Sequence, residues 1–140
     1  MTTDALKAAL SHLEIDENPV SVRAKSRDFF WYSPVLKARM DHLSADFVVS
    51  PRSEAEVIEV LREAHRLNVP VTVRGAGTGN YGQAMPMRGG VILHMRHMTA
   101  VKEIHPGRVI AEPGCIVRDL DAATRAHSGQ ELRMNPSTYT

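Results

Sequence analysis

The most informative stretch of the chain reads Val71-Thr72-Val73-Arg74-Gly75-Ala76-Gly77-Thr78-Gly79-Asn80-Tyr81-Gly82-Gln83. Its first three residues are β-branched and predict a strand, and four glycines then fall within eight residues. Because glycine lacks a Cβ, successive residues of such a loop can adopt positive φ and turn their amide N–H groups toward one anion. The stretch therefore predicts a strand that leads into a phosphate-binding loop, in preference to a flexible surface loop.

The glycines also satisfy the spacing G-x-G-x-x-G at Gly77, Gly79 and Gly82, which is typical of dinucleotide-binding Rossmann units. In that motif a helix begins among the glycines, and its N-terminus binds part of the pyrophosphate. Here Pro86 and the pair Gly89-Gly90 follow closely and oppose a long helix. A phosphate-binding loop without a helix behind it is the better interpretation, and no Gly-Lys-Ser/Thr follows that would indicate a nucleotide triphosphatase.

Before the loop, the pattern predicts a strand, a helix and a second strand. Residues 46–49 form a short β-branched run that Ser50-Pro51 ends, and Ser53 with Glu56 fits a capping box that opens a helix. The helix should end near Asn68, ahead of Pro70, and make a crossover between parallel strands. Its expected apolar stripe consists of Val57, Ile58, Leu61, Ala64 and Leu67.

After the loop, the sequence predicts three strands and a helix. The strands cover residues 91–93, 100–104 and 108–111, and the last two should pair as a hairpin. The helix should run over residues 116–127, and Gly129 should end it. Its expected inward residues are Val117, Leu120, Ala123 and Thr124.

The first part of the chain gives a weaker pattern. A short surface helix is expected at residues 4–13, whereas residues 18–43 look irregular because Pro19 and Pro34 act as breakers. Four consecutive aromatic residues, Phe29 to Tyr32, are expected to pack on the domain rather than to bind a ligand. We accordingly divide the chain into an N-terminal helix and aromatic anchoring segment, residues 1–45, and a domain that begins at residue 46.

Composition excludes several classes of function. Lysine and arginine total 17 against 16 acidic residues, so no basic field is expected to bind nucleic acid. The first ten residues show no basic region followed by an apolar core, and no apolar run is long enough to span a membrane, so neither export nor membrane spanning is expected. A single cysteine, Cys115, suits a cytoplasmic protein.

The histidines and the single cysteine give only weak candidates for a metal site or a reactive thiol. His94 and His97 are three residues apart, which on an extended segment places them on opposite faces, so no metal site is expected. Cys115 lies near the start of a predicted helix, where the dipole could lower the pKa of its thiol. A small buried cysteine is the favoured interpretation.

Three segments together resemble a known family: residues 50–57, residues 69–79 and Glu112-Pro113-Gly114. In order and spacing they are similar to the FAD-binding domain of the vanillyl-alcohol oxidase and p-cresol methylhydroxylase type. The sequence of residues 74–79 is most similar to that of the D-2-hydroxy-acid branch, which includes the glycolate oxidase subunit and the D-lactate dehydrogenase flavoproteins. The resemblance covers residues 46–140 and implies an α+β fold, the first part of such a domain, with a small mixed or parallel sheet and crossover helices.

The resemblance also implies a cofactor site. Backbone amides of residues 75–80 would contact the FAD pyrophosphate, and residues 136–138 would approach the ribityl chain or the flavin ring. Because residues 74–83 contain no histidine, the FAD is expected to be bound non-covalently. His94 stands where relatives commonly have aspartate. The cofactor-binding residues implied are Arg74, Gly75, Ala76, Gly77, Thr78, Gly79, Asn80, Gln83, Pro136, Ser137 and Thr138.

The activity implied is that of an FAD-dependent oxidoreductase that oxidises a 2-hydroxy acid or a related alcohol by hydride transfer to flavin N5. The sequence ends at Thr140, before the family's second glycine motif, so we expect a part of a longer parent chain that is inactive alone. The alternative is a truncated product that acts as a binding module or remnant. Catalytic residues stay unassigned, and the expected partners are a small-molecule substrate with other subunits or an electron acceptor.

Overall fold

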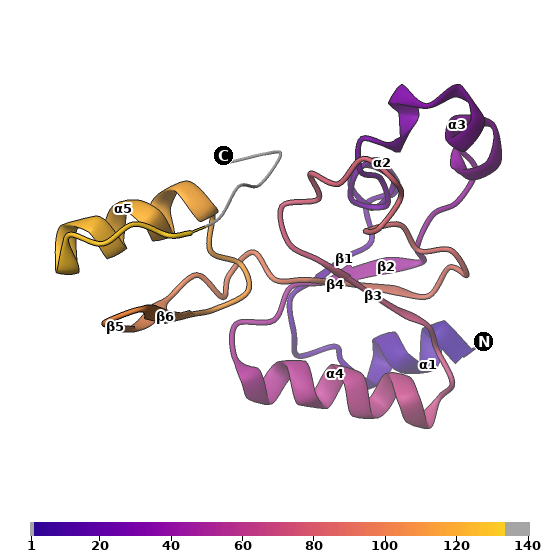
Figure 1. Cartoon of the computed structure of the whole chain (residues 1–140). Helices are drawn as coiled ribbons and strands as arrows, with labels where there is room; N and C mark the ends of the chain where they lie inside the picture. The colour runs from indigo at the N-terminus through magenta and orange to yellow at the C-terminus, as the bar shows by residue number, and fades with distance from the viewer. Residues whose placement is uncertain (1, 134–140) are drawn as a thin grey trace.

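A four-stranded sheet lies at the centre of the structure (Figure 1). The computed structural model describes residues 2–133. The strand order is β1-β2-β4-β3, with β1 antiparallel to β2 and the other neighbours parallel. The strands are β1 (Ile15–Asp16), β2 (Phe47–Val49), β3 (Val71–Arg74) and β4 (Val91–His94).

The parallel crossover predicted from the sequence is present, but β4 lies between the two strands that it connects. β2 and β3 are each parallel to β4, so they run in the same direction without touching. β4 takes the central position because Val91, Ile92 and Leu93 are fully buried and can be covered on both faces. β3 has Thr72 and an exposed Val73, and it forms the edge.

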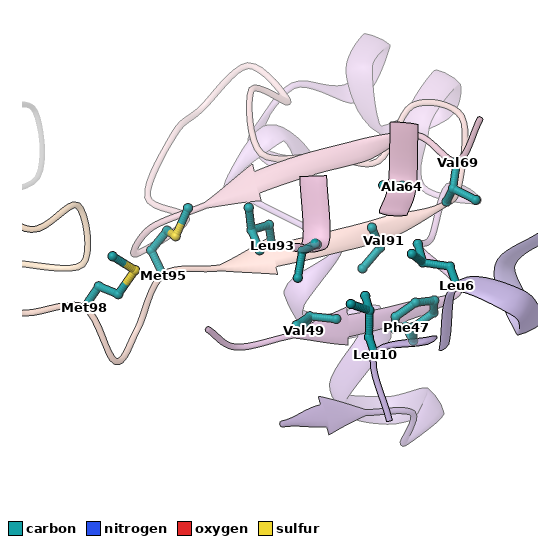
Figure 2. Packing of buried hydrophobic residues seen from close by; sticks show 11 residues of the cluster. Leu6, Leu10, Phe47, Val49, Ala64, Val69, Val91, Leu93, Met95 and Met98 are labelled. Carbon is teal, nitrogen blue, oxygen red and sulfur yellow. The ribbon is translucent and has the colours of Figure 1, made fainter. Parts of the chain in front are cut away.

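Helices cover both faces of the sheet (Figure 1). α1 (Thr2–Ala9) and α4 (Glu54–Arg66) pack on one face, and α2 (Pro19–Lys25) packs on the other. Side chains alternate along β2, so that Phe47 and Val49 face α4 while Val48 faces α2. Figure 2 shows the larger cluster, formed by Leu6, Leu10, Phe47, Val49, Val60, Ala64, Val69, Val91, Leu93, Met95 and Met98.

The helix α4 begins as its capping pattern predicts. The Ser53 Oγ accepts the Glu56 amide at 3.3 Å, whereas the Glu56 carboxylate accepts the amide of Arg52 rather than that of Ser53. Two members of the predicted apolar stripe, Ile58 and Leu61, are 47% and 44% exposed, and that part of the prediction was wrong. The buried stripe consists of Val57, Val60, Ala64 and Leu67, whose spacing of three and four residues follows the helical period.

The irregular structure expected for residues 18–43 was also wrong. α2 and α3 (Pro34–Met40) both begin with a proline. Proline suits this position because its fixed φ is helical and its missing N–H would have no intrahelical partner there. Asn18 and Ser33 cap the two helices with their side-chain oxygens.

The aromatic residues lie around the short 3-10 helix η1 (Phe30–Tyr32). Phe30 is buried against Met40 and Met85, but Trp31 and Tyr32 are 44% and 68% exposed. The predicted packing of the whole cluster is therefore correct for Phe30 alone. Successive side chains of a tight turn point in different directions, so only one of them can face the core.

A second unit follows the sheet. β5 (Val101–His105) and β6 (Arg108–Ala111) form the predicted hairpin, and α5 (Val117–Ser128) packs on β5 (Figure 1). Gly129 ends α5 with a φ of 69°. Of the residues predicted to face inward, Thr124 is buried, whereas Val117, Leu120 and Ala123 are only partly buried.

Candidate functional site

The glycine loop, residues 74–83, leaves the carboxyl end of β3 beside the carboxyl end of β4. Arg74 and His94 are partners in the register of these two strands. Ligands of open parallel sheets bind outside this end of the strands. No helix forms between β3 and β4, as the sequence predicts for a phosphate-binding loop.

Gly77 is required in this loop for two reasons. Its φ of 73° lies in the left-handed region, as does the φ of 82° at Gly82. A Cβ on Gly77 would also overlap the guanidinium of Arg74, which lies directly against it. The positively charged Arg74 guanidinium thus occupies the space that a side chain at residue 77 would need.

Arg74 is a half-buried cation without an ionic partner among residues 2–133. Its Nη1 donates hydrogen bonds to the carbonyls of Lys25 and Arg27, at 2.9 and 2.6 Å. Its Nη2 has no acceptor within the described part of the chain and faces Gly77. Burial lowers the pKa of Arg74, an effect that the charge of Asp28 opposes, yet a guanidinium stays protonated in proteins. Such a charge favours an anion as its missing partner.

Further bonds fix the middle of the loop. The Gly79 carbonyl accepts the amide of Phe29 at 2.8 Å, and the Gln83 Oε1 accepts the amide of Tyr81 at 3.0 Å. A side chain on Gly79 would collide with the carboxamide of Gln83. Gln83 therefore holds the far end of the loop closed over Gly79.

A buried carboxylate lies next to the loop. Asp28 is 4% exposed, and its Oδ1 accepts the amide of Phe30 at 2.8 Å. Its Oδ2 has no hydrogen-bond partner in the described structure and lies near Gly79. Asp28 could not be identified from the sequence, because nothing in its local pattern distinguishes it from a surface aspartate.

His94 is neutral at ordinary pH. Burial first, then the charges of Arg74 and Lys25, lower the pKa of His94 to about 4. Its Nδ1 lacks a partner within residues 2–133. His97 points elsewhere and pairs with Glu14 at 2.9 Å. In the same described range, no group of three histidine, cysteine or acidic side chains is placed to hold a metal ion.

Cys115 is not an activated thiol. α5 begins only at Val117, and the Cys115 Sγ donates to the carbonyl of Thr99 at 3.0 Å. Burial raises the pKa of Cys115, which is opposite to the lowering considered from the sequence. The thiol is therefore protonated and poorly reactive.

The predicted site residues from Arg74 to Gln83 all lie in one loop. The remaining three, Pro136, Ser137 and Thr138, lie outside the described residues. Gln83 also lines a hollow of about 430 Å³ along the outer edge of β3. Across the described ranges, none of the helices has the length and apolar character needed to cross a membrane.

Comparison with known proteins bears on the same residues. The model of a family described as "FAD binding domain" matches residues 45–140. An uncharacterized FAD-linked oxidoreductase of Mycobacterium tuberculosis is 38% identical over 92 residues, which are 64% of this chain and 20% of that protein. The glycolate oxidase subunit GlcD of Escherichia coli K12 is 43% identical over 75 residues, covering 52% of this chain and 15% of the relative. D-lactate dehydrogenase of Archaeoglobus fulgidus is 36% identical over 94 residues, which are 66% of this chain and 21% of that protein.

Solved structures share the fold. An alkyldihydroxyacetonephosphate synthase superposes with a TM-score of 0.77 at 20% identity, over 99% of this chain and 26% of its own. p-Cresol methylhydroxylase superposes with a TM-score of 0.67 at 15% identity, over 89% of this chain and 24% of its own. The chain thus spans about a fifth of the length of the curated relatives and about a quarter of these structures.

Proposed function

Because the chain belongs to the FAD binding domain family, we propose that its glycine loop binds the diphosphate of FAD. The amides of residues 75–80 surround the diphosphate, and Gln83 keeps the loop closed. The observation that carries this proposal is the half-buried Arg74, whose Nη2 lies against Gly77 with no acceptor among residues 2–133. A diphosphate supplies the negative charge and the acceptor oxygens that this guanidinium lacks.

For the whole protein we propose an oxidoreductase that acts on a 2-hydroxy acid or a related alcohol. When bound, FAD supplies the group that accepts a hydride at N5. The names of two relatives, a glycolate oxidase subunit and a D-lactate dehydrogenase, support this substrate class. We assign to the chain itself the binding and orientation of the cofactor, because the contacts of Arg74, Gly77 and Gln83 shape the loop to hold an anion.

Three finer features belong to the same proposal. The FAD is bound non-covalently, since residues 74–83 contain no histidine to form a bond with the flavin. Residues 136–138 approach the ribityl chain or the ring. The protein takes a small-molecule substrate and passes electrons to another subunit or a separate acceptor. We place this activity in the cytoplasm, where the single Cys115 stays reduced.

Titration of FAD into the purified whole protein tests the proposal. Flavin fluorescence should change to saturation at one FAD per chain, and ADP, which has the same diphosphate, should compete. Denaturation should then release unmodified FAD, as expected for a non-covalent cofactor. An absence of saturable FAD binding would refute the proposed cofactor site. Anaerobic addition of D-lactate or glycolate to the FAD-loaded protein, followed by loss of visible flavin absorbance, tests the substrate class.

A further inference from the structure

Residues 25–30, here named the supporting segment, touch the glycine loop at two places. Near its start, Arg74 donates to the carbonyls of Lys25 and Arg27. In its middle, the Gly79 carbonyl accepts the amide of Phe29. The supporting segment lies outside residues 45–140, to which the family model corresponds.

The contact made by Arg74 depends on geometry as well as charge. A single nitrogen, Nη1, bonds two carbonyls, and this leaves Nη2 directed at Gly77. The planar guanidinium fixes both directions at once, whereas an ammonium group would offer one nitrogen for all three positions. Lysine at residue 74 would therefore keep the charge but lose either the supporting segment or the loop.

We propose that the supporting segment is a functional wall of the cofactor site, and that Arg74 is the positioning residue that couples it to the loop. The bonds to Lys25 and Arg27 hold the guanidinium beneath Gly77, and the Phe29 amide holds Gly79. Together they keep the loop amides aimed at one diphosphate. This inference rests on the proposed function, because it concerns the same FAD.

Coupling of this kind is reciprocal. If the supporting segment stabilises the loop that binds FAD, then bound FAD must stabilise the supporting segment by the same free energy. The Phe29 amide reports this directly, since its hydrogen bond to the Gly79 carbonyl must break before it exchanges with solvent. We expect FAD to slow hydrogen exchange of the Phe29 amide on the order of tenfold.

Three variants test the role of Arg74 in the whole protein. Arg74→Lys keeps the charge and Arg74→Met removes it. Arg66→Met is the matched control, because within residues 2–133 Arg66 pairs only with Glu63, on the surface of α4. We expect both Arg74 variants to weaken FAD and ADP binding by roughly tenfold or more, and the control to bind both as the wild type does. Equal losses for FAD and ADP would locate the effect at the diphosphate.

The outcomes separate this inference from the proposed function. Wild-type protein that binds no FAD would overturn both. Wild-type protein that binds FAD while Arg74→Lys binds it equally well would leave the cofactor site standing and overturn the positioning role. Should the Arg74 variants fail to fold, exchange at Phe29 in the wild type decides, and an unchanged rate with FAD would overturn the coupling.

Discussion

At the scale of single residues, Gly77 and Arg74 show what a motif can and cannot predict. The density of glycines predicted a loop with positive φ, and Gly77 and Gly82 have it. The sequence could not show that Arg74 turns back beneath Gly77 to bond Lys25 and Arg27, because these residues are brought there by the fold. For the same reason Asp28 was missed, although it is the buried carboxylate nearest the loop.

Replacement of Gly77 with alanine should weaken FAD binding on the order of tenfold, because the new Cβ displaces the Arg74 guanidinium. The matched control is Gly107→Ala, since Gly107 has a φ of 77° and nothing near its missing Cβ. In both variants an alanine at positive φ should lower the free energy of unfolding by about 1 to 2 kcal/mol. Only Gly77→Ala should change the FAD dissociation constant, and equal binding by both variants would refute the steric argument.

At the scale of elements, the starts and ends of helices and strands could largely be predicted, whereas the neighbour of each strand in the sheet could not. The capping of α4, the β5–β6 hairpin and the Gly129 stop all follow from short-range patterns, which the structure confirms. Pro19 and Pro34 led to the wrong prediction of irregular structure, because proline breaks a helix only in its interior. In the first turn it is favoured, and both prolines lie there. The neighbour of β2 could not be predicted, since strand order depends on burial across the whole sheet.

Gly90 directly precedes β4 and lies against Pro70, which directly precedes β3, so its replacement should destabilise the sheet. It has a φ of 76°, and a Cβ there would overlap the carbonyl of Pro70, which accepts the Val91 amide at 2.9 Å. Gly90→Ala should lower the free energy of unfolding by about 2 kcal/mol or more. The control Gly129→Ala has similar φ and open space, so its loss should be about 1 kcal/mol. Urea unfolding measures both, and equal losses would contradict the predicted clash.

Glu14 connects three separate segments through Arg52, Arg96 and His97. Hydrogen bonds from His97 and then Arg96 lower the pKa of Glu14 from 4.5 to about 2. The folded protein thus favours the carboxylate, and its stabilising effect is present above pH 4.5 and lost as pH falls toward 2. Between these values the wild-type Tm should fall more steeply than that of Glu14→Gln. Parallel Tm curves would show that the cluster contributes nothing to folding.

At the scale of the whole molecule, the two units differ in their cores. The sheet and its helices bury eleven side chains in one cluster, whereas residues 99–133 contribute only Asp121 and Thr124 to the buried residues. The sequence pattern predicted β2, α4, β3 and β4 in the first unit and β5, β6 and α5 in the second, but it missed β1, α2 and α3. It could not predict this difference, because burial depends on what packs against each element.

We therefore expect residues 101–128 to open before the four-stranded sheet does. Few buried apolar contacts oppose local unfolding there, so amides of β5, β6 and α5 should exchange with solvent at least about tenfold faster than those of β2 and β4. Native-state hydrogen exchange measures both sets in one sample. Uniform protection across the two units would mean that the chain unfolds as one cooperative body.

The most direct test of the central claim is a titration of FAD followed by the backbone amide resonances of the glycine loop. We predict that FAD shifts the resonances of residues 75–80 to saturation, because their N–H groups bond the diphosphate. The amides of α4, on the far side of the sheet from α2, should shift little. Binding of FAD with no change at residues 75–80 would contradict the claim that this loop holds the cofactor.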